Sequence, residues 1–376
     1  MKPLTALDKA GKIIRENIKF KTEIIETQNS LGYFTASKII SPEDFPSFDR
    51  ALFDGYALNS KKTGNAGGRY IAPKKISTGQ ILPDGTDCVL MLEDAIIKNG
   101  RLIINEKIEQ YKNVIRKGED FKKGEVIFKK VHKLRPQDVA LLLGLGIKKI
   151  KVYKKVSFGI IASGNEIVPF NKKPGYGQVR DMNSGMMMNL VKSHGGDAEF
   201  LGICPDRSGE ILKFIKGAKK FDAILFCGAT SVGARDILEP ALLKFPGCKM
   251  LFHGLRIRPG KPALAAKMKN QLIIGIPGRP SSGFVVFNLL VKPVLNYFSE
   301  NDKKITALLN KDLRPRTEIE EYVPVKLVQK NNIFYAEPVI AAHSSFSPYI
   351  HCHGLMRIPA GVETIGKGEK VEITII

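Results

Sequence analysis

The stretch from Phe221 to Asp236 constrains the fold more than any other part of the chain. It begins with an apolar run, Ala223 to Phe226, of the kind that a buried parallel strand shows. A loop of small residues follows, from Gly228 to Gly233, and then a helix-like segment from Ile237 to Phe245. Strand, small-residue loop and helix in this order are typical of an anion site, because glycines let backbone N–H groups approach an oxyanion and the helix N-terminus adds positive potential. The loop alone does not distinguish such a site from a tight turn without a ligand.

Strands and helices alternate on both sides of this stretch, and the spacing predicts an α/β domain with a doubly wound, mostly parallel sheet over residues 151–300. The other predicted strands are Val156 to Ala162, Ala198 to Ile203, Ala263 to Ala266 and Leu272 to Ile276. The predicted helices are Met182 to His194, Glu210 to Ala218 with Asp206 and Ser208 as caps, and Phe284 to Phe298, which should kink or end at Pro293. Ligands of such sheets bind beyond the carboxyl ends of the strands. We therefore expect one edge to gather Glu166, Asp206, Ser231, Asp236 and the loop from Pro277 to Ser282.

The flanking regions have a different character. Residues 1–150 are predicted to form an N-terminal region: a helix over 1–30, a small β domain inserted at about 46–130, and a short helix from Gln137 to Gly144. Within it, Asp54-Gly55 between apolar residues predicts a hairpin turn. Residues 301–376 carry short alternating strands and no predicted helix, which indicates a separate C-terminal β-barrel.

Length and composition exclude several classes of protein. A chain of 376 residues is too long for one ordinary core, so two to four domains are expected. The five cysteines are scattered without a CxxC pair, which argues against a disulfide frame or a zinc ribbon. His351 and His353 could converge on a strand, but no second ligand pair follows at zinc spacing. There is no apolar run long enough for a membrane span and no signal-peptide core, so a cytoplasmic location without membrane contact is expected.

The formal net charge of +22 suggests a polyanionic partner. The lysines, however, are spread along the whole chain, and the densest patch, Lys148 to Lys155, alternates like a strand with one solvated face. No basic helix with interleaved aromatic residues and no nucleic-acid-binding motif accompanies them. We predict no specific nucleic-acid recognition, and a generally basic proteome explains the charge equally well.

Seven short motifs follow one another along almost the whole chain: Asp54 to Ala57, Thr78-Gly79 with Leu82-Pro83 and Asp87, Gly118 to Asp120, Ser163 to Glu166, Gly228 to Asp236, Arg258 to Pro262, and Pro277 to Pro280. In this order and spacing they resemble the molybdopterin molybdenumtransferase family, the MoeA and gephyrin E-domain proteins of molybdenum cofactor synthesis. Each motif is weak alone, but seven in register argue strongly against chance.

The resemblance implies an elongated homodimer of four-part chains. It implies a transferase that hydrolyses adenylylated molybdopterin, inserts molybdate into the dithiolene and releases AMP, with Mg²⁺ required. The adenylyltransferase that makes the adenylylated substrate is a candidate partner.

The resemblance also assigns site residues. The implied catalytic residues are Asp54, Asp120, Glu166 and Asp236, and in the family the first two close on the site of the other subunit. The implied Mg²⁺ ligands are Glu166, Asp206 and Asp236, which offer hard carboxylate oxygens. The implied substrate-binding residues are Thr78, Asp206, Gly228, Ser231, Gly233, Arg256, Arg258, Lys261, Pro277, Pro280 and Ser282. The cations and hydroxyl groups among them suit molybdate and pyrophosphate, which are both anions.

Four departures from the family motifs bear on activity: Ala51 replaces a serine, Asn165 an aspartate, Ala229 a glycine and Arg279 an asparagine. They leave open a divergent paralogue or a non-catalytic scaffold. A molybdopterin adenylyltransferase is a further alternative, but those enzymes are usually the bare α/β domain. Since the other charged residues of the motifs survive, an active enzyme is expected.

Overall fold

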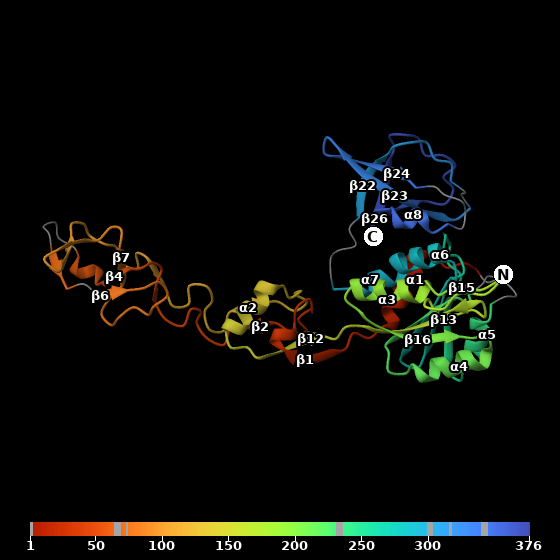
Figure 1. Ribbon diagram of the computed structural model, residues 1–376, viewed down its shortest axis with the longest axis horizontal. Coiled ribbons are helices and arrows are strands. Elements are labelled where there is room, and N and C mark those ends of the chain that lie inside the picture. Colours follow the sequence, from red (N-terminus) through yellow and green to blue (C-terminus); the bar gives the residue numbers. More distant parts are fainter. Residues whose placement is uncertain are drawn as a thin grey trace. The chain divides into compact units, whose positions relative to one another are not determined.

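The computed structural model describes residues 3–63, 69–72, 74–230, 236–298, 304–315, 318–339 and 345–376 (Figure 1). The chain divides into two compact units, one formed by Met1–Lys21 with Lys154–Ile376 and the other by Thr22–Tyr153. Within the described ranges, no helix is both long and apolar enough to cross a membrane.

A six-stranded sheet forms the centre of the first unit, in the order β16-β13-β17-β21-β20-β18. Its strands are β13 Ser157–Ser163, β16 Asp197–Cys204, β17 Ala223–Cys227, β18 Cys248–His253, β20 Leu264–Met268 and β21 Gln271–Ile276. The first four strands in the sheet order are parallel, whereas β20 is antiparallel to both β21 and β18. The predicted α/β sheet is therefore confirmed, with an antiparallel strand near one edge.

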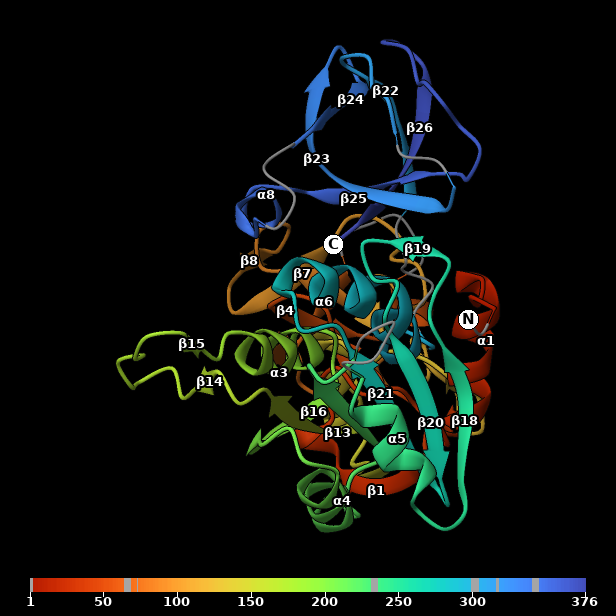
Figure 2. The ribbon, with the colours of Figure 1, turned by 90° about the vertical axis from the view of Figure 1, so that its right-hand side faces the viewer.

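Helices cover both faces of this sheet, as the wholly apolar sequence of β17 requires. Alternate residues of β17 belong to different cores: Leu225 packs with Met187 of α3, and Ile224 packs with Ile211 of α4. Figures 1 and 2 show α1, α3 and α6 on one side of the sheet and α4 and α5 on the other. Their bounds are α1 Leu7–Asn17, α3 Asn183–Ser193, α4 Ser208–Gly217, α5 Leu238–Leu243 and α6 Pro280–Val286.

Two predicted helices differ from the observed ones. The helix expected over residues 1–30 ends at Asn17, and Thr22–Glu26 forms strand β1 of the other unit. The helix expected from Phe284 begins at Pro280 and passes through a π-helical segment, Phe287–Val291, into α7, Lys292–Leu295. The widened π turn lies directly before Pro293, whose missing N–H cannot support a regular helix there.

The C-terminal part of the first unit is a closed barrel in which β23 pairs with both β24 and β25. Its strands are β22 Lys304–Leu309, β23 Glu320–Lys330, β24 Ile333–Pro338, β25 Gly354–Ile358 and β26 Lys370–Ile375, and β19 Ile257–Arg258 joins β23. The expectation of no helix here is wrong, because Ser347–Ile350 forms the short helix α8. Tyr322 and Leu355 are buried in the core that the α/β part shares, so the barrel packs directly on it.

The second unit combines the helix α2, Pro136–Gly144, with short antiparallel strands. The strands are β1 Thr22–Glu26, β2 Ile39–Ile40, β3 Arg50–Ala51, β4 Gly55–Leu58, β5 Arg69–Ile71, β6 Lys74–Ile76, β7 Cys88–Met91, β8 Ile96–Lys98, β9 Arg101–Ile104, β10 Val114–Ile115, β11 Val126–Phe128 and β12 Lys149–Tyr153. The hairpin expected at Asp54-Gly55 is wrong, because Gly55 begins β4 and pairs with β6 and β7. A β-carbon on Gly55 would lie 2.1 Å from Leu90 O, so this glycine permits close strand approach.

A buried carboxylate fixes the start of α2. The Asp138 side chain is 4% exposed, accepts hydrogen bonds from the Arg135 guanidinium and backbone N–H, and lies 2.9 Å from His132 Nε2. Burial alone would raise the pKa of Asp138, but these hydrogen bonds outweigh it and lower the pKa to about 2.

We expect Asp138→Asn to destabilise this unit by about 2 kcal/mol near neutral pH. Because the folded pKa lies below the unfolded one, the contribution is present above about pH 4 and is lost as the pH falls toward 2. Urea unfolding across this range measures it, with Glu26→Gln, which breaks an exposed pair with Lys149, as the control that changes little. An Asp138→Asn effect that does not vary with pH would contradict the assignment.

Candidate active site

A cleft of about 1570 Å³ opens at the carboxyl ends of the parallel strands, between the loops of the α/β part and the C-terminal barrel. Seven of the predicted site residues line it: Glu166, Asp206, Gly228, Arg258, Lys261, Pro277 and Ser282. They come from five separate segments of the chain, because parallel strands deliver their following loops to one edge of the sheet.

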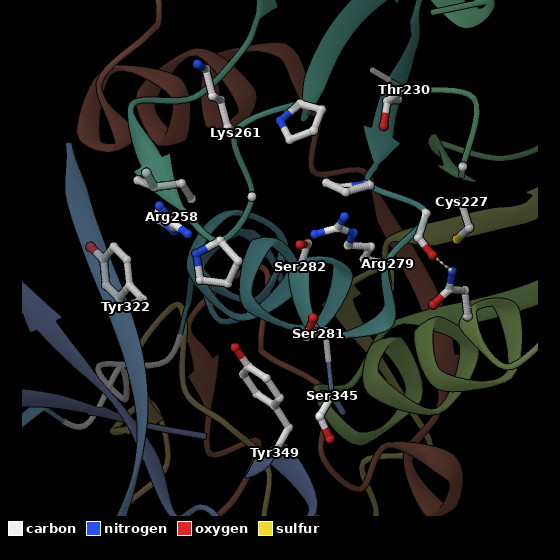
Figure 3. Close-up of a pocket in the computed structure, with 18 of the residues that line it drawn as sticks. Cys227, Thr230, Arg258, Lys261, Arg279, Ser281, Ser282, Tyr322, Ser345 and Tyr349 are labelled. Atoms are coloured by element: carbon white, nitrogen blue, oxygen red, sulfur yellow. Dashed lines mark hydrogen bonds between the residues drawn. The ribbon is translucent and has the colours of Figure 1, made fainter. Parts of the chain in front are cut away.

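Positive charge and hydroxyl groups gather on one side of the cleft. Arg258 and Lys261 lie on the loop around β19, and Arg279 precedes α6 (Figure 3). Ser281 and Ser282, in the first turn of α6, present hydroxyl groups beside the arginine. Such a set of guanidinium, ammonium and hydroxyl donors is suited to an oxyanion.

Several carboxylates line the same cleft, and two of them, Glu166 and Asp206, are predicted site residues. Asp206 Oδ1 accepts a hydrogen bond from Ser163 Oγ at 2.7 Å, and the Asp206 N–H donates to Asn165 Oδ1 at 3.2 Å. Asp206 therefore orients the end of β13. The expectation that Asp206 and Ser208 cap α4 is wrong, because that helix has no side-chain cap. Glu166 is exposed, and within the described part of the chain no hydrogen bond or ion pair engages its carboxylate. The remaining oxygens of both groups are available to a hard cation.

Gly228 forms the floor of the cleft at the end of β17. Its φ of +105° lies in the region that favours glycine, and a β-carbon there would be 2.3 Å from Ser163 O. Its N–H donates to Ile276 O at 2.9 Å, which ties β17 to the end of β21. The next residue, Ala229, also has a positive φ of +53° and therefore carries backbone strain where the family motif has glycine.

The other predicted site residues lie elsewhere or outside the description. Arg256 and Pro280 are described but do not line the cleft. Ser231 and Gly233 lie outside the described residues, so nothing tests their predicted roles. Asp54, Thr78 and Asp120 belong to the second unit.

In that second unit the structure brings together two predicted residues that are 24 positions apart. Asp54 Oδ1 accepts hydrogen bonds from the Thr78 N–H at 2.6 Å and from Thr78 Oγ1 at 2.9 Å. The backbone hydrogen bond is the main reason that the pKa of Asp54 is lowered, so its carboxylate is ionised at neutral pH. Asp120 lies in a turn, and its N–H donates to Phe45 O.

Asp236, predicted as a catalytic residue and Mg²⁺ ligand, lies with Glu239 and His253 rather than among the residues lining the cleft. Its side chain is 6% exposed, and burial raises its pKa. Of the three predicted metal ligands, Glu166 and Asp206 line the cleft, whereas Asp236 directly precedes the lining residue Ile237.

Several lining residues carried no functional signal in the sequence. Asn183, the first residue of α3, lines the cleft and donates to Gly278 O at 2.7 Å. Tyr322 and Tyr349 come from the barrel, and the Tyr349 hydroxyl points toward Ser281 (Figure 3). Burial raises the pKa of Tyr349 to about 12, so the hydroxyl is a neutral hydrogen-bonding group. The polar residues Asp181 and Asn183 at the start of α3 could have indicated Asn183, whereas the tyrosines depend on how the barrel packs.

The doubly wound sheet, its oxyanion-suited rim and the barrel that closes one side of the cleft define a multidomain α/β protein of the molybdopterin-binding type. Three family models match consecutive parts of the chain: the MoeA N-terminal region (domain I and II) over residues 5–146, a probable molybdopterin binding domain over 159–297, and the MoeA C-terminal region (domain IV) over 306–376. The predicted boundaries near residues 150 and 300 stay predictions, since the two compact units divide the chain differently.

Relatives of known name agree with these models. The chain is 32% identical to the molybdopterin molybdenumtransferase of Haemophilus influenzae over 78% of its own length and 77% of the relative's. It is 31% identical to a putative molybdopterin biosynthesis protein of Methanocaldococcus jannaschii over 98% and 95% of the two chains. Its fold matches the crystal structure of a molybdopterin biosynthesis MoeA protein from Pyrococcus horikoshii with a TM-score of 0.85, 29% identity and 99% coverage of both chains. The chain belongs to the molybdopterin molybdenumtransferase family.

Proposed function

We propose that this protein is a molybdopterin molybdenumtransferase, which inserts molybdenum from molybdate into adenylylated molybdopterin during molybdenum cofactor synthesis and releases AMP. The single observation that supports this most is the composition of the cleft. Arg258, Lys261 and Arg279 face the same space as the carboxylates of Glu166 and Asp206. A site for two anionic reactants beside a divalent cation needs both signs of charge within one cavity.

Glu166 and Asp206 fit the Mg²⁺ that the family implies, because both offer hard oxygens and neither carboxylate is fully engaged by other described groups. We assign the cation to these two residues. When bound, Mg²⁺ would neutralise charge developing on the phosphoanhydride as it is cleaved. The cationic side chains would hold the anions, while Ser281 and Ser282 would donate hydrogen bonds that fix their orientation.

The proposal also includes the predicted residues of the second unit, the oligomeric state, the location and the partner enzyme. Asp54, held ionised by Thr78, and Asp120 are proposed active-site acids. The chain is proposed to act as a homodimer in the cytoplasm and to receive its substrate from the molybdopterin adenylyltransferase.

The experiment is conversion of adenylylated molybdopterin with molybdate and Mg²⁺, measured as AMP release and as activity of a reconstituted apo-molybdoenzyme. Formation of both products supports the proposal. Binding of the pterin without AMP release or active cofactor would refute it and would favour a non-catalytic scaffold.

A further inference from the structure

The C-terminal barrel also lines the cleft, and part of its contribution is aromatic and apolar. These residues are Tyr322, Val323 and Pro324 of β23 and Pro348 and Tyr349 of α8. The cleft of about 1570 Å³ exceeds the volume of about 300–1,000 Å³ that small-molecule sites commonly have. An oxyanion and a cation on the α/β side therefore leave room for a larger, uncharged group against the barrel.

Aromatic packing fixes the Tyr349 ring at the boundary between the barrel and α6. The ring stacks on Phe346, with centroids 5.9 Å apart and an angle of 17° between the planes. It also packs edge-to-face against Phe284 of α6, at 5.6 Å and 62°. Phe284 follows Ser281 by three positions, so the two lie on the same face of α6. The Tyr349 hydroxyl is directed toward the first turn of this helix (Figure 3).

Two hydroxyl groups in this place, Tyr349 Oη and Ser281 Oγ, have no hydrogen-bond partner within the described part of the chain. Ser281 is 7% exposed, and it lines the cleft. Buried polar groups in native structures are normally hydrogen bonded, so two open hydroxyl groups in one cleft indicate a ligand. Burial raises the pKa of Tyr349 to about 12, so its hydroxyl stays neutral and does not repel an anionic substrate.

The other tyrosine of this wall is satisfied within the protein. The Tyr322 hydroxyl donates to Glu320 Oε1, which also accepts from Arg357 Nε at 2.7 Å. Tyr322 is 4% exposed and belongs to the core that the barrel shares with the α/β part. Its hydroxyl therefore has a structural role, whereas the hydroxyl of Tyr349 is available to a ligand.

We propose that Tyr349 and Ser281 recognise the polar edge of a heteroaromatic ring of the substrate, with Tyr349 as the residue that determines specificity. This inference rests on the proposed function, because the ring belongs to adenylylated molybdopterin. That substrate carries two such rings, the pterin and the adenine, and each has a hydrogen-bond donor and an acceptor side by side on one edge. The Tyr349 hydroxyl would donate to the ring acceptor, and the Ser281 oxygen would accept from the ring N–H.

Ser281 can contact the ring and an anion at the same time. A serine hydroxyl has one hydrogen to donate and two lone pairs that accept. It can therefore donate to an oxyanion held beside Ser282 and still accept a hydrogen bond from the ring. The ring and the anion would then occupy adjacent positions, joined by one side chain of α6.

The test is isothermal titration calorimetry of full-length wild-type protein and Tyr349→Phe with three ligands: AMP for the adenine, pterin-6-carboxylate for the pterin, and molybdate as an anion without a ring. Phenylalanine keeps the packing on Phe284 and Phe346 but removes the hydroxyl, so the variant should fold as wild type does. It should bind at least one ring ligand about 10-fold more weakly, because the ring acceptor is left unpaired, and molybdate with unchanged affinity. The ligand that is weakened identifies the ring.

Ser281→Ala should weaken binding of the same ring ligand. The control is Tyr335→Phe on β24, a tyrosine of the same barrel that does not line the cleft, and it should bind all three ligands as wild type does. The inference is overturned if wild type binds neither ring ligand, if Tyr349→Phe binds both as tightly as wild type, or if it loses affinity for molybdate as much as for a ring. None of these measurements uses AMP release or molybdenum insertion, so failure of the ring site and failure of the proposed function are distinguishable.

Discussion

Glu166→Gln is expected to lower the rate of molybdenum insertion by at least about 100-fold, the scale on which one electrostatic group in an active site acts. Glutamine keeps the size and hydrogen-bonding reach of the side chain but removes the negative charge that a hard cation requires. The carboxylate is exposed in the cleft and supports no described neighbour, so stability should change by no more than about 0.5 kcal/mol. AMP release measures the loss of rate, and urea unfolding measures the stability.

The matched control is Glu210→Gln. Glu210 is an acidic residue of the same α/β part, where it pairs with Lys213 on the outer surface of α4. This variant should insert molybdenum at the wild-type rate. If Glu166→Gln retained full activity at saturating Mg²⁺, the assignment of the cation to Glu166 and Asp206 would have to be abandoned.

One part of the site follows directly from the local sequence pattern. Glu166, Asp206 and Gly228 each follow a predicted parallel strand within a few residues, and all three line the cleft. The prediction needed only strand identity and parallel direction, because parallel strands place their carboxyl ends at one edge. The polar residues after such strands are therefore brought together whatever the lengths of the intervening helices.

Asp236 was grouped with Glu166 and Asp206 by the expected sheet edge and by motif, and in the structure it lies with Glu239 and His253. Its neighbour His253 is 17 positions away and reaches the same edge only because β20 turns back between β21 and β18. A short apolar strand does not reveal in its sequence whether it runs parallel or antiparallel to its neighbours. The sequence shows that Asp236 and Glu239 are three positions apart, but it does not show that His253 lies beside them.

The barrel residues of the cleft were beyond prediction for a different reason. Tyr322 lies on strand β23 and Tyr349 on the short helix α8. The sequence pattern of each element predicts which of its sides is buried, but not which domain covers that side. That choice follows from packing between two domains, which depends on shape over many residues. The hairpin predicted at Asp54-Gly55 is wrong for a similar reason. Glycine is required at position 55 because the Leu90 carbonyl oxygen lies so close, and not because the chain turns there.

Gly228→Ala is expected to destabilise the first unit by about 2–5 kcal/mol, the sum of a left-handed backbone penalty and of overpacking against a neighbour. The φ of +105° excludes an unstrained β-carbon. Such a β-carbon would lie 2.3 Å from Ser163 O, which is a backbone atom at the end of β13 and cannot move independently as a side chain could. Relief requires the ends of β13 and β17 to separate, which also moves Asp206 through its hydrogen bond to Ser163. Activity should therefore fall together with stability, measured by urea unfolding and by AMP release.

The next residue supplies the matched control, because Ala229→Gly makes the opposite change in the same loop. Ala229 holds a φ of +53°, and glycine there relieves about 1 kcal/mol of strain, offset in part by the greater entropy of the unfolded chain. The variant should be as stable as wild type or slightly more stable, and it should remain active. If Gly228→Ala were tolerated as well as Ala229→Gly, the backbone of the loop would have to differ from the one described. A rigid loop at Gly228 could then no longer explain anion binding in the cleft.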